Sequence, residues 1–270
     1  MTARFAIYAA PGSGPADPAG VLLRETAERW LGRGVTADPV TPGIADGWTR
    51  EAIDAITVSA RRYGFHGTLK APFRLAEGCT PEELDDALTR FAAARERVLV
   101  PRLRLARLGG FFALIPGAAA AELYALADEV VTAFDRFRAP PTEAEIARRR
   151  PESLTPRQRE LLKAWGYPYV LDEFRFHLTV TDSIPLARRP AVEATLTDWF
   201  AASLGATVPV NALALFTEAE PGAPSMLRSV YPLRPTSPAP GIQTSPSVQT
   251  SPSAEIPPRA ASTADSEGAQ

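Results

Sequence analysis

The sequence predicts an α+β fold in which helices cover antiparallel sheets. Short apolar runs bounded by glycine and proline, which are typical of strands, alternate with segments whose apolar residues recur at helical spacing. Two runs flank a Gly-Gly pair, which indicates a hairpin, and strands and helices do not alternate strictly, which favours antiparallel sheets. One short pattern occurs twice, and this predicts a bilobal, duplicated body with a central cleft and helices on its outer faces.

The composition separates a folded body from a tail. The chain has 270 residues, of which 45% are hydrophobic, and this is ample for one large domain or two small ones. Residues 235–270 are rich in Pro, Ser, Thr and Ala and contain no aromatic residue. They cannot bury enough apolar surface to offset the entropy of ordering, so we expect a disordered tail. The body is then 1–234, with lobes of roughly 1–115 and 116–234.

The first half of the body is expected to contain helices and strands in mixed order. These are a strand at 5–9, helices at 17–31 and 49–60, a strand within 61–73 for which Pro72 is the stop signal, a helix at 80–97, and strands at 98–108 and 111–116. The helix that follows Thr80 has the clearest start. Thr80 can cap it, Pro81 suits the first helical position, and Glu83 can complete a capping box.

The second half is expected to continue in the same manner. It should contain a helix at 119–137, short helices that begin after Thr142 and Thr155, a strand at 173–182, a helix at 187–204, and strands at 210–216 and 228–233. Thr142 with Glu145, and Thr155 with Gln158, repeat the capping pattern.

Composition also argues against several classes of function. Charged residues make up 22% and the net charge is −2, so no basic field favours nucleic acid, and a small phosphorylated substrate fits better. The lone cysteine, Cys79, excludes an internal disulfide and lacks metal-ligand spacing with the two histidines, so we expect no metal and no other cofactor. Without a signal peptide or a long apolar run, we expect a cytoplasmic protein that does not contact membranes. The oligomeric state stays open.

Both histidines of the chain lie in the same short pattern, Phe-His-x-Thr-aliphatic. The copies contain His66 with Thr68 and His177 with Thr179. On a strand, residues two apart share a face, so each histidine and its threonine point together, away from the apolar neighbours. If the lobes are related by an approximate two-fold axis, both polar faces line one cleft.

This set of side chains suits chemistry at a phosphate. An imidazole titrates near neutral pH, so one histidine can act as base and the other as acid. The hydroxyls of Thr68 and Thr179 can donate hydrogen bonds to phosphate oxygens as charge develops on them. Which of His66 and His177 is the acid stays open at this point.

Other candidates carry less weight. Tyr8 could line the cleft, and Lys70 and Arg175, which share the predicted polar faces of the two motif strands, could hold a second anionic group. The arginines at 148–150 are interpreted as a solvated helix face. The glycine-rich residues 11–15 lack the lysine and the following helix of a phosphate-binding loop.

With these residues in place, the chain resembles the two-histidine (2H) phosphoesterase superfamily, which includes cyclic nucleotide phosphodiesterases and LigT-like RNA ligases. The strings RRYGFHGTLKAPF and TPRQRELLKAWGYPYVLDEFRFHLTVT resemble its branch of phosphonate metabolism proteins. The resemblance covers about residues 3–234 and implies a bilobal fold with both motifs in a central groove. It also implies that His66 and His177 are catalytic and that Thr68 and Thr179 contact phosphate.

The function expected on this basis is that of a 2H-type cyclic phosphodiesterase, a hydrolase that opens a small cyclic phosphodiester without a metal. A ribosyl cyclic phosphate from phosphonate breakdown is one such substrate. Two alternatives stay open: an RNA-end 2′,3′-cyclic phosphodiesterase or 2′,5′ ligase, and a non-catalytic phosphate-ligand binding protein of a phosphonate-use system. RNA binding would require a basic groove and steep salt dependence.

Overall fold

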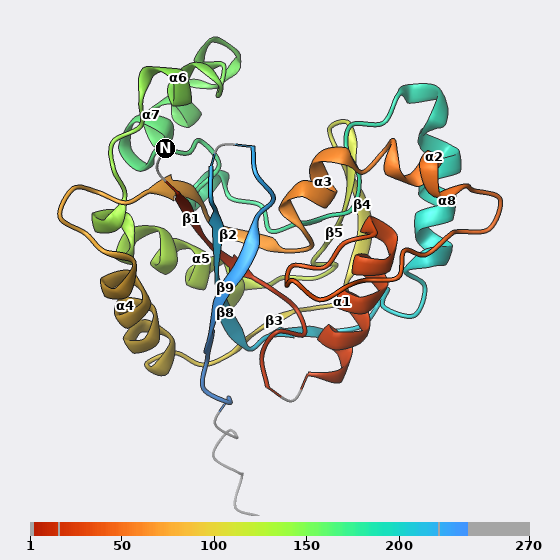
Figure 1. The fold of residues 1–270 in the computed structure, drawn as a ribbon, viewed down its shortest axis with the longest axis horizontal. Coiled ribbons are helices and arrows are strands. Elements are labelled where there is room, and N and C mark those ends of the chain that lie inside the picture. Colours follow the sequence, from red (N-terminus) through yellow and green to blue (C-terminus); the bar gives the residue numbers. More distant parts are fainter. Residues whose placement is uncertain (1–2, 16, 221, 237–270) are drawn as a thin grey trace, which may run out of the picture. The chain divides into compact units, whose positions relative to one another are not determined.

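The computed structural model describes residues 3–15, 17–220 and 222–236. These residues form a mixed α+β structure with eight α-helices and a large antiparallel sheet, which confirms the predicted fold class (Figure 1). Nearly all of the predicted tail, residues 237–270, lies outside the described residues.

The helices and strands follow one another in mixed order along the chain. The strands are β1 (Arg4–Ala9), β2 (Gly67–Arg74), β3 (Val98–Val100), β4 (Arg104–Leu108), β5 (Phe111–Ile115), β6 (Leu178–Thr179), β7 (Val208–Val210), β8 (Ala212–Glu218) and β9 (Met226–Pro232). The α-helices are α1 (Pro18–Leu31), α2 (Arg50–Asp54), α3 (Val58–Tyr63), α4 (Pro81–Ala93), α5 (Ala121–Ala133), α6 (Glu143–Ala147), α7 (Pro156–Trp165) and α8 (Arg189–Trp199). Short 3₁₀ turns occur at Asp135–Phe137, Pro151–Ser153, Leu171–Glu173 and Leu186–Arg188.

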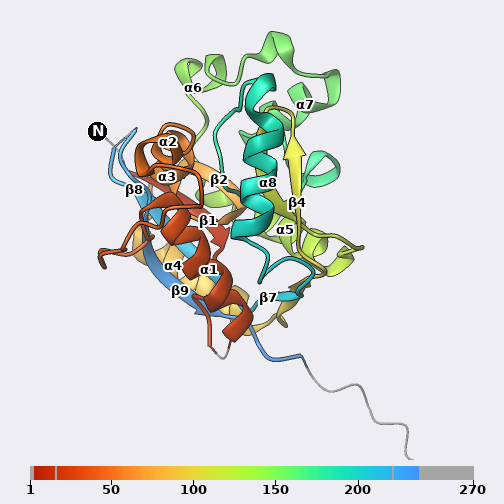
Figure 2. The ribbon, with the colours of Figure 1, turned by 90° about the vertical axis from the view of Figure 1, so that its right-hand side faces the viewer.

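Seven of the strands form one sheet in the order β4-β5-β6-β2-β1-β8-β9, and every neighbouring pair is antiparallel. Figures 1 and 2 both show α8 (teal) beside β4 (yellow) at one edge of this sheet, with β9 (blue) at the other edge. The remaining strands, β3 and β7, pair with each other in a small second sheet.

The two halves of the large sheet meet where Gly67 of β2 pairs with Leu178 of β6. These residues directly follow the two histidines, so the motif strands lie side by side at the centre. A side chain on Gly67 would come within 2.6 Å of ring atoms of Phe176. The two strands can therefore approach only because residue 67 has no Cβ.

The halves of the sheet do not correspond to the lobes expected at 1–115 and 116–234. Strands β4 and β5 belong to the first half of the chain but lie beside β6, whereas β8 and β9 belong to the second half but lie beside β1. The two halves of the chain thus exchange strands. On one side β6 pairs directly with β5 of the first half, and on the other side β8 of the second half pairs with β1, the neighbour of β2.

The main core lies on one face of the sheet. Successive residues of β1 alternate between faces, as the pleat requires. Phe5, Ile7 and Ala9 join a large buried cluster that includes residues of α1, α4, α5 and α8. Ala6 and Tyr8 belong to a smaller cluster that also contains Phe216. This second face carries the site described below.

The three predicted capping boxes are present in the structure. Thr80 accepts a hydrogen bond from the Glu83 amide at 3.2 Å, and the Glu83 carboxylate accepts one from the Thr80 amide at 2.9 Å. The starts of α6 and α7 contain the same reciprocal pair. Hydrogen bonds between residues three apart in the chain therefore determine where these helices begin.

Several predicted elements differ in extent. The helix expected at 49–60 is two helices, α2 and α3, and the strand expected at 61–73 begins only after α3 has ended. That strand continues through Pro72, because the register with β1 shifts between Phe5 and Ile7 and forms a bulge there. A bulge tolerates a residue without an amide hydrogen.

The strand expected at 173–182 is reduced to two residues, because the chain before Leu178 pairs with neither neighbour. Among the described residues, no helix is both long and apolar enough to cross a membrane.

The close contact at the centre of the sheet gives a test of its tight packing. Gly67→Ala should destabilise the protein by about 1–3 kcal/mol, the usual cost of overpacking, because the new methyl group meets the ring of Phe176. Phe176→Leu removes that ring, so the double variant should lose less stability than the sum of the single variants. Urea unfolding of all four proteins would measure this coupling. Strict additivity would contradict the contact.

Candidate active site

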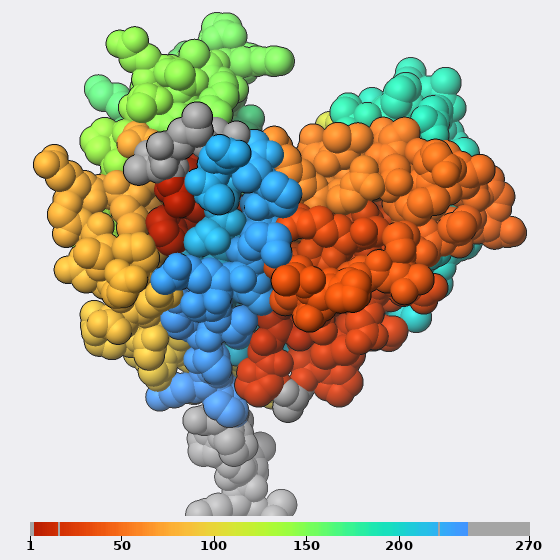
Figure 3. Space-filling model, in the orientation of Figure 1, coloured from red at the N-terminus to blue at the C-terminus, as the bar shows by residue number. Residues whose placement is uncertain are grey.

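A cleft of about 690 Å³ opens on the second face of the sheet, and its lining includes both motifs. A volume of this size suits a small molecule. In Figure 3 the surface is hollowed between the green atoms of α6 and α7 and the orange atoms of the α2–α3 region. Side chains from these regions line the cleft together with His66, Thr68, His177 and Thr179.

The sheet register explains why these four side chains gather. Gly67 pairs with Leu178. One residue to either side, the antiparallel register places His66 opposite Thr179, and Thr68 opposite His177. All four lie on the face opposite Gly67 and Leu178. The two His-Thr pairs are therefore crossed: on adjacent strands, each histidine lies opposite the threonine of the other motif.

The two imidazoles are held in the same way. Nδ1–H of His66 donates to the carbonyl of Gly64 at 2.9 Å, and Nδ1–H of His177 donates to the carbonyl of Arg175 at 2.7 Å. A carbonyl only accepts, so Nδ1 carries the hydrogen in both rings. The Nε2 atoms are then available to accept or donate a proton at a ligand in the cleft.

The surroundings of the two rings differ. The ring of His66 stacks on Tyr8, with centroids 3.7 Å apart and planes at 16°, whereas His177 lies at 5.8 Å from the ring of Phe111 in a tilted arrangement. Protein atoms crowd His66 although part of its surface faces the cleft. This desolvation, together with the nearby His177, lowers the pKa of His66 to about 4, against the opposing effect of its bond to Gly64. His66 is therefore neutral at pH 7.

The segment before His66 is anchored by Asp182, which follows the second motif. The carboxylate of Asp182 accepts hydrogen bonds from the amides of Ser59 and Ala60 at 3.0 Å each, at the start of α3. Helix α3 ends at Gly64, whose φ of +75° favours glycine. The carbonyl of Gly64 then receives the imidazole. A residue just after the second motif therefore helps to orient the histidine of the first.

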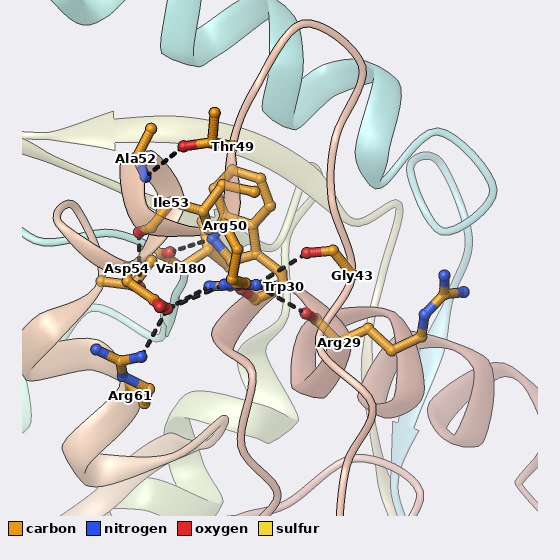
Figure 4. A network of polar contacts seen from close by, with 11 residues as sticks. Arg29, Trp30, Gly43, Thr49, Arg50, Ala52, Ile53, Asp54, Arg61 and Val180 are labelled. Carbon is orange, nitrogen blue, oxygen red and sulfur yellow. Dashed lines mark hydrogen bonds and ion pairs between the residues drawn. The ribbon is translucent and has the colours of Figure 1, made fainter.

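A second polar network, shown in Figure 4, joins α1, α2 and α3 beneath the cleft. The guanidinium of Arg50 donates to the carbonyl of Trp30 at 2.9 Å and to Asp54 at 2.7 Å. Arg61 of α3 donates to the same Asp54 oxygen at 2.6 Å. The indole of Trp30 donates to the carbonyl of Val180 at 2.8 Å, at the end of the second motif. The network ties α3 and the second motif to the core.

The structure separates the three weaker candidates. Tyr8 lines the cleft as expected. Lys70 does not: its Nζ is buried and donates to Asp135 at 3.2 Å and to the carbonyl of Val131 at 3.1 Å. The register shift between Ile7 and Tyr8 breaks the predicted alternation between Thr68 and Lys70.

Arg175 also differs from the expectation. It lines another cavity, beside Arg104 and Glu193, because the chain at 174–177 is not a strand and side-chain alternation does not hold there. Its backbone carbonyl still contributes to the site through His177.

The glycine-rich residues 11–15 are followed by α1, the helix expected at 17–31, so they do not lack a following helix. Their neighbour Asp17 caps this helix. One carboxylate oxygen accepts from the amide of Gly20 at 2.7 Å and the other from the amide of Gly12 at 3.2 Å. Amides that would hold a phosphate in a phosphate-binding loop donate to Asp17 instead, and no lysine follows. This segment is therefore unsuited to bind a nucleotide phosphate.

Several cleft residues escaped the sequence analysis. Arg149, taken as part of a solvated helix face, lines the cleft, with its guanidinium carbon 4.7 Å from the ring centroid of Tyr167. Arg4 and Tyr63 also line it. The run of arginines at 148–150 was the one sequence signal for Arg149. Nothing in the spacing of the sequence shows that the turn after α6 faces the cleft.

Fold and cleft together define an α+β protein with a paired-histidine site in a cleft of about 690 Å³. A family match places it further: residues 68–226 match the family described as "Protein of unknown function (DUF1045)". The chain belongs to this family. The match begins at Thr68 and includes the whole second motif.

Two curated proteins are similar over a longer stretch. Both are named ribose 1,5-bisphosphate phosphokinase PhnN. The protein of Janthinobacterium sp. (strain Marseille) is 38% identical over 227 residues, which cover 82% of this chain and 49% of the relative. That of Laribacter hongkongensis (strain HLHK9) is 35% identical over 221 residues, with 82% and 49% covered. The chain spans about half the length of these relatives.

These names correct the expected enzyme class. The sequence predicted a hydrolase, a 2H-type cyclic phosphodiesterase, whereas both relatives are named as kinases, which transfer a phosphoryl group. The hydrolase assignment is therefore not retained.

The lowered pKa of His66 makes the stability depend on pH. The unfolded chain, with an ordinary pKa of 6.5, binds a proton between pH 6.5 and 4, while the folded protein does not. Stability from this group is therefore present above pH 6.5 and is lost as the pH falls toward 4. Relative to His66→Gln, the wild type should lose about 2–3 kcal/mol between pH 7 and 4.5. Denaturant unfolding at both pH values measures this, and an equal loss in both proteins would contradict it.

Proposed function

We propose that the cleft binds a small ribose phosphate and that His66 and His177 transfer protons while its phosphoryl group passes from the ester oxygen, which leaves as a hydroxyl, to a hydroxyl of a second sugar, in phosphonate metabolism. The observation that carries the proposal is the crossed arrangement of the two His-Thr pairs on adjacent strands. The resemblance of both motifs to the 2H superfamily supports the same arrangement.

The distinct surroundings of the histidines suggest their roles. His66 is neutral at pH 7 and has Nε2 free, so it takes the proton of the acceptor hydroxyl as that oxygen bonds to phosphorus. A bound phosphate dianion stabilises the resulting imidazolium and so raises the pKa of His66. His177 gives a proton to the oxygen that leaves. Exchange with solvent then restores both rings.

The remaining cleft side chains can hold the phosphate. Thr68 and Thr179 lie beside the histidines, so their hydroxyls can donate to the non-bridging oxygens. Tyr8 supports the ring of His66 by stacking. These contacts explain how the chain itself could orient a phosphate between the two Nε2 atoms.

A ribose phosphate is favoured by two observations. The relatives are named for action on ribose 1,5-bisphosphate, and the cleft volume of about 690 Å³ accommodates a molecule of that size. The strings around both motifs resemble phosphonate metabolism proteins, which supports placing the reaction there.

Replacing either histidine should abolish turnover without preventing binding. His66→Gln and His177→Gln should each lower the rate by about 10²–10⁴-fold, the usual share of one acid or base. Purified protein would be incubated with ribose 1-phosphate, ribose 5-phosphate and ribose 1,5-bisphosphate, singly and in pairs so that each can serve as phosphoryl donor or acceptor, and ³¹P NMR would follow the phosphorus resonances. Thermal unfolding would verify that the variants are folded. A wild type that binds these compounds but never changes their spectra would show a binding protein and overturn the catalytic proposal.

The threonine hydroxyls give an independent test. Thr68→Val and Thr179→Val keep the shape of the side chain but remove the donor, so each should weaken phosphate binding or slow turnover by about tenfold. Titration calorimetry and the NMR assay would separate the two effects. Thr197→Val on the outside of α8 is a matched control, because this exposed residue lies outside the lining of the cleft and its hydroxyl donates to the carbonyl of Glu193 on the same helix. Unchanged binding and turnover in both motif variants would exclude a role for the hydroxyls.

A further inference from the structure

A second cavity, about 420 Å³ in volume, adjoins the histidine cleft. The two share Arg4, Tyr63, Pro72 and Arg149 in their linings. Because this wall is common, a ligand held by the histidines at one end can place its other end in the second cavity.

The second cavity is strongly basic. Six arginines and two glutamates line it: Arg4, Arg62, Arg74, Arg138, Arg148, Arg149, Glu145 and Glu218. We call it the arginine cavity. Such a charge excess in a concave site favours an anion.

Half of these arginines are neutralised by nearby carboxylates. Arg4 bonds to the buried Glu218, with Nε 2.7 Å from Oε2. Arg74 is paired with Glu145 at 3.2 Å. Arg138 is paired with Asp135 at 2.7 Å. These pairs shape the wall and contribute little net charge.

The other three arginines have no such partner. Within the described part of the chain, no carboxylate forms an ion pair with Arg62, Arg148 or Arg149. The Nε–H of Arg62 is buried, yet it finds no acceptor among the described residues. A buried donor without a partner is rare in folded proteins and indicates a missing acceptor. Arg149 lies at the junction of the cavities, over Tyr167.

We propose that the arginine cavity binds a second phosphate of the substrate, so that the protein selects a bisphosphorylated sugar over a monophosphorylated one. The proposal rests on the proposed function, in which the histidine cleft holds the first phosphate. Guanidinium groups match phosphate oxygens in pairs of parallel hydrogen bonds. Arg62 and Arg148 are the specificity-determining residues, and Arg149 contacts the ligand where it passes between the cavities.

The test compares binding of ribose 1,5-bisphosphate with that of ribose 1-phosphate and ribose 5-phosphate by titration calorimetry. The wild type should bind the bisphosphate at least about tenfold more tightly than either monophosphate. Arg62→Gln and Arg148→Gln should each reduce this preference about tenfold while leaving monophosphate binding in the histidine cleft unchanged. Arg150→Gln, in the same run but outside the lining of the cavity, should keep the preference and serves as the matched control.

The outcomes separate this proposal from the proposed function. A preference that survives both substitutions, or that is absent in the wild type, overturns the second phosphate site even if the NMR assay detects turnover. A preference that depends on Arg62 and Arg148 supports the site even if no compound is turned over. Arg148 is exposed at the surface, so its substitution should leave the fold intact, and thermal unfolding would verify this for each variant.

Discussion

The pairing of Gly67 with Leu178 is the constraint on which the rest of the site depends. It joins the two halves of the large sheet and fixes the register of both motif strands. Once that register is set, the pleat decides that two histidines and two threonines share a face. The ring of Phe176 fills the space that a side chain at residue 67 would need. A steric limit at a single glycine thus determines where four polar groups meet.

Much of the local structure could be read from the sequence, because it depends on neighbours in the chain. The capping boxes at Thr80, Thr142 and Thr155 involve residues three apart, and all three are present. The gathering of His66 and His177 was also predictable from their shared pattern. Lys70 and Arg175 were misplaced because a bulge and an unpaired segment interrupt the alternation of side chains. Such irregularities arise from pairing with distant strands, which sequence spacing does not report. The arginine cavity likewise combines residues from six separate segments.

Electrostatics divides the candidate site into two parts. The histidine cleft contains the two imidazoles, which share one mode of attachment but differ in their surroundings, and it meets Arg4 and Arg149 at the wall that it shares with the second cavity. The neighbouring cavity concentrates fixed positive charge. Such a division suits a ligand with one reacting phosphate and one that serves as an anchor. The names of the relatives agree with a phosphorylated ribose, although the chain spans about half of their length.

The exchange of strands between the two halves of the chain has a consequence for how the protein acquires its structure. β1 pairs with β8 in a register that joins Ile7 to Leu215, so β1 needs a partner strand that is made much later. During synthesis, β1 and β2 must wait with an unpaired edge until Ala212–Glu218 has emerged from the ribosome. Contacts of such long range slow folding and expose apolar strands to aggregation. The arrangement that assembles the site at the centre of the sheet therefore delays completion of that sheet until β8 has been made.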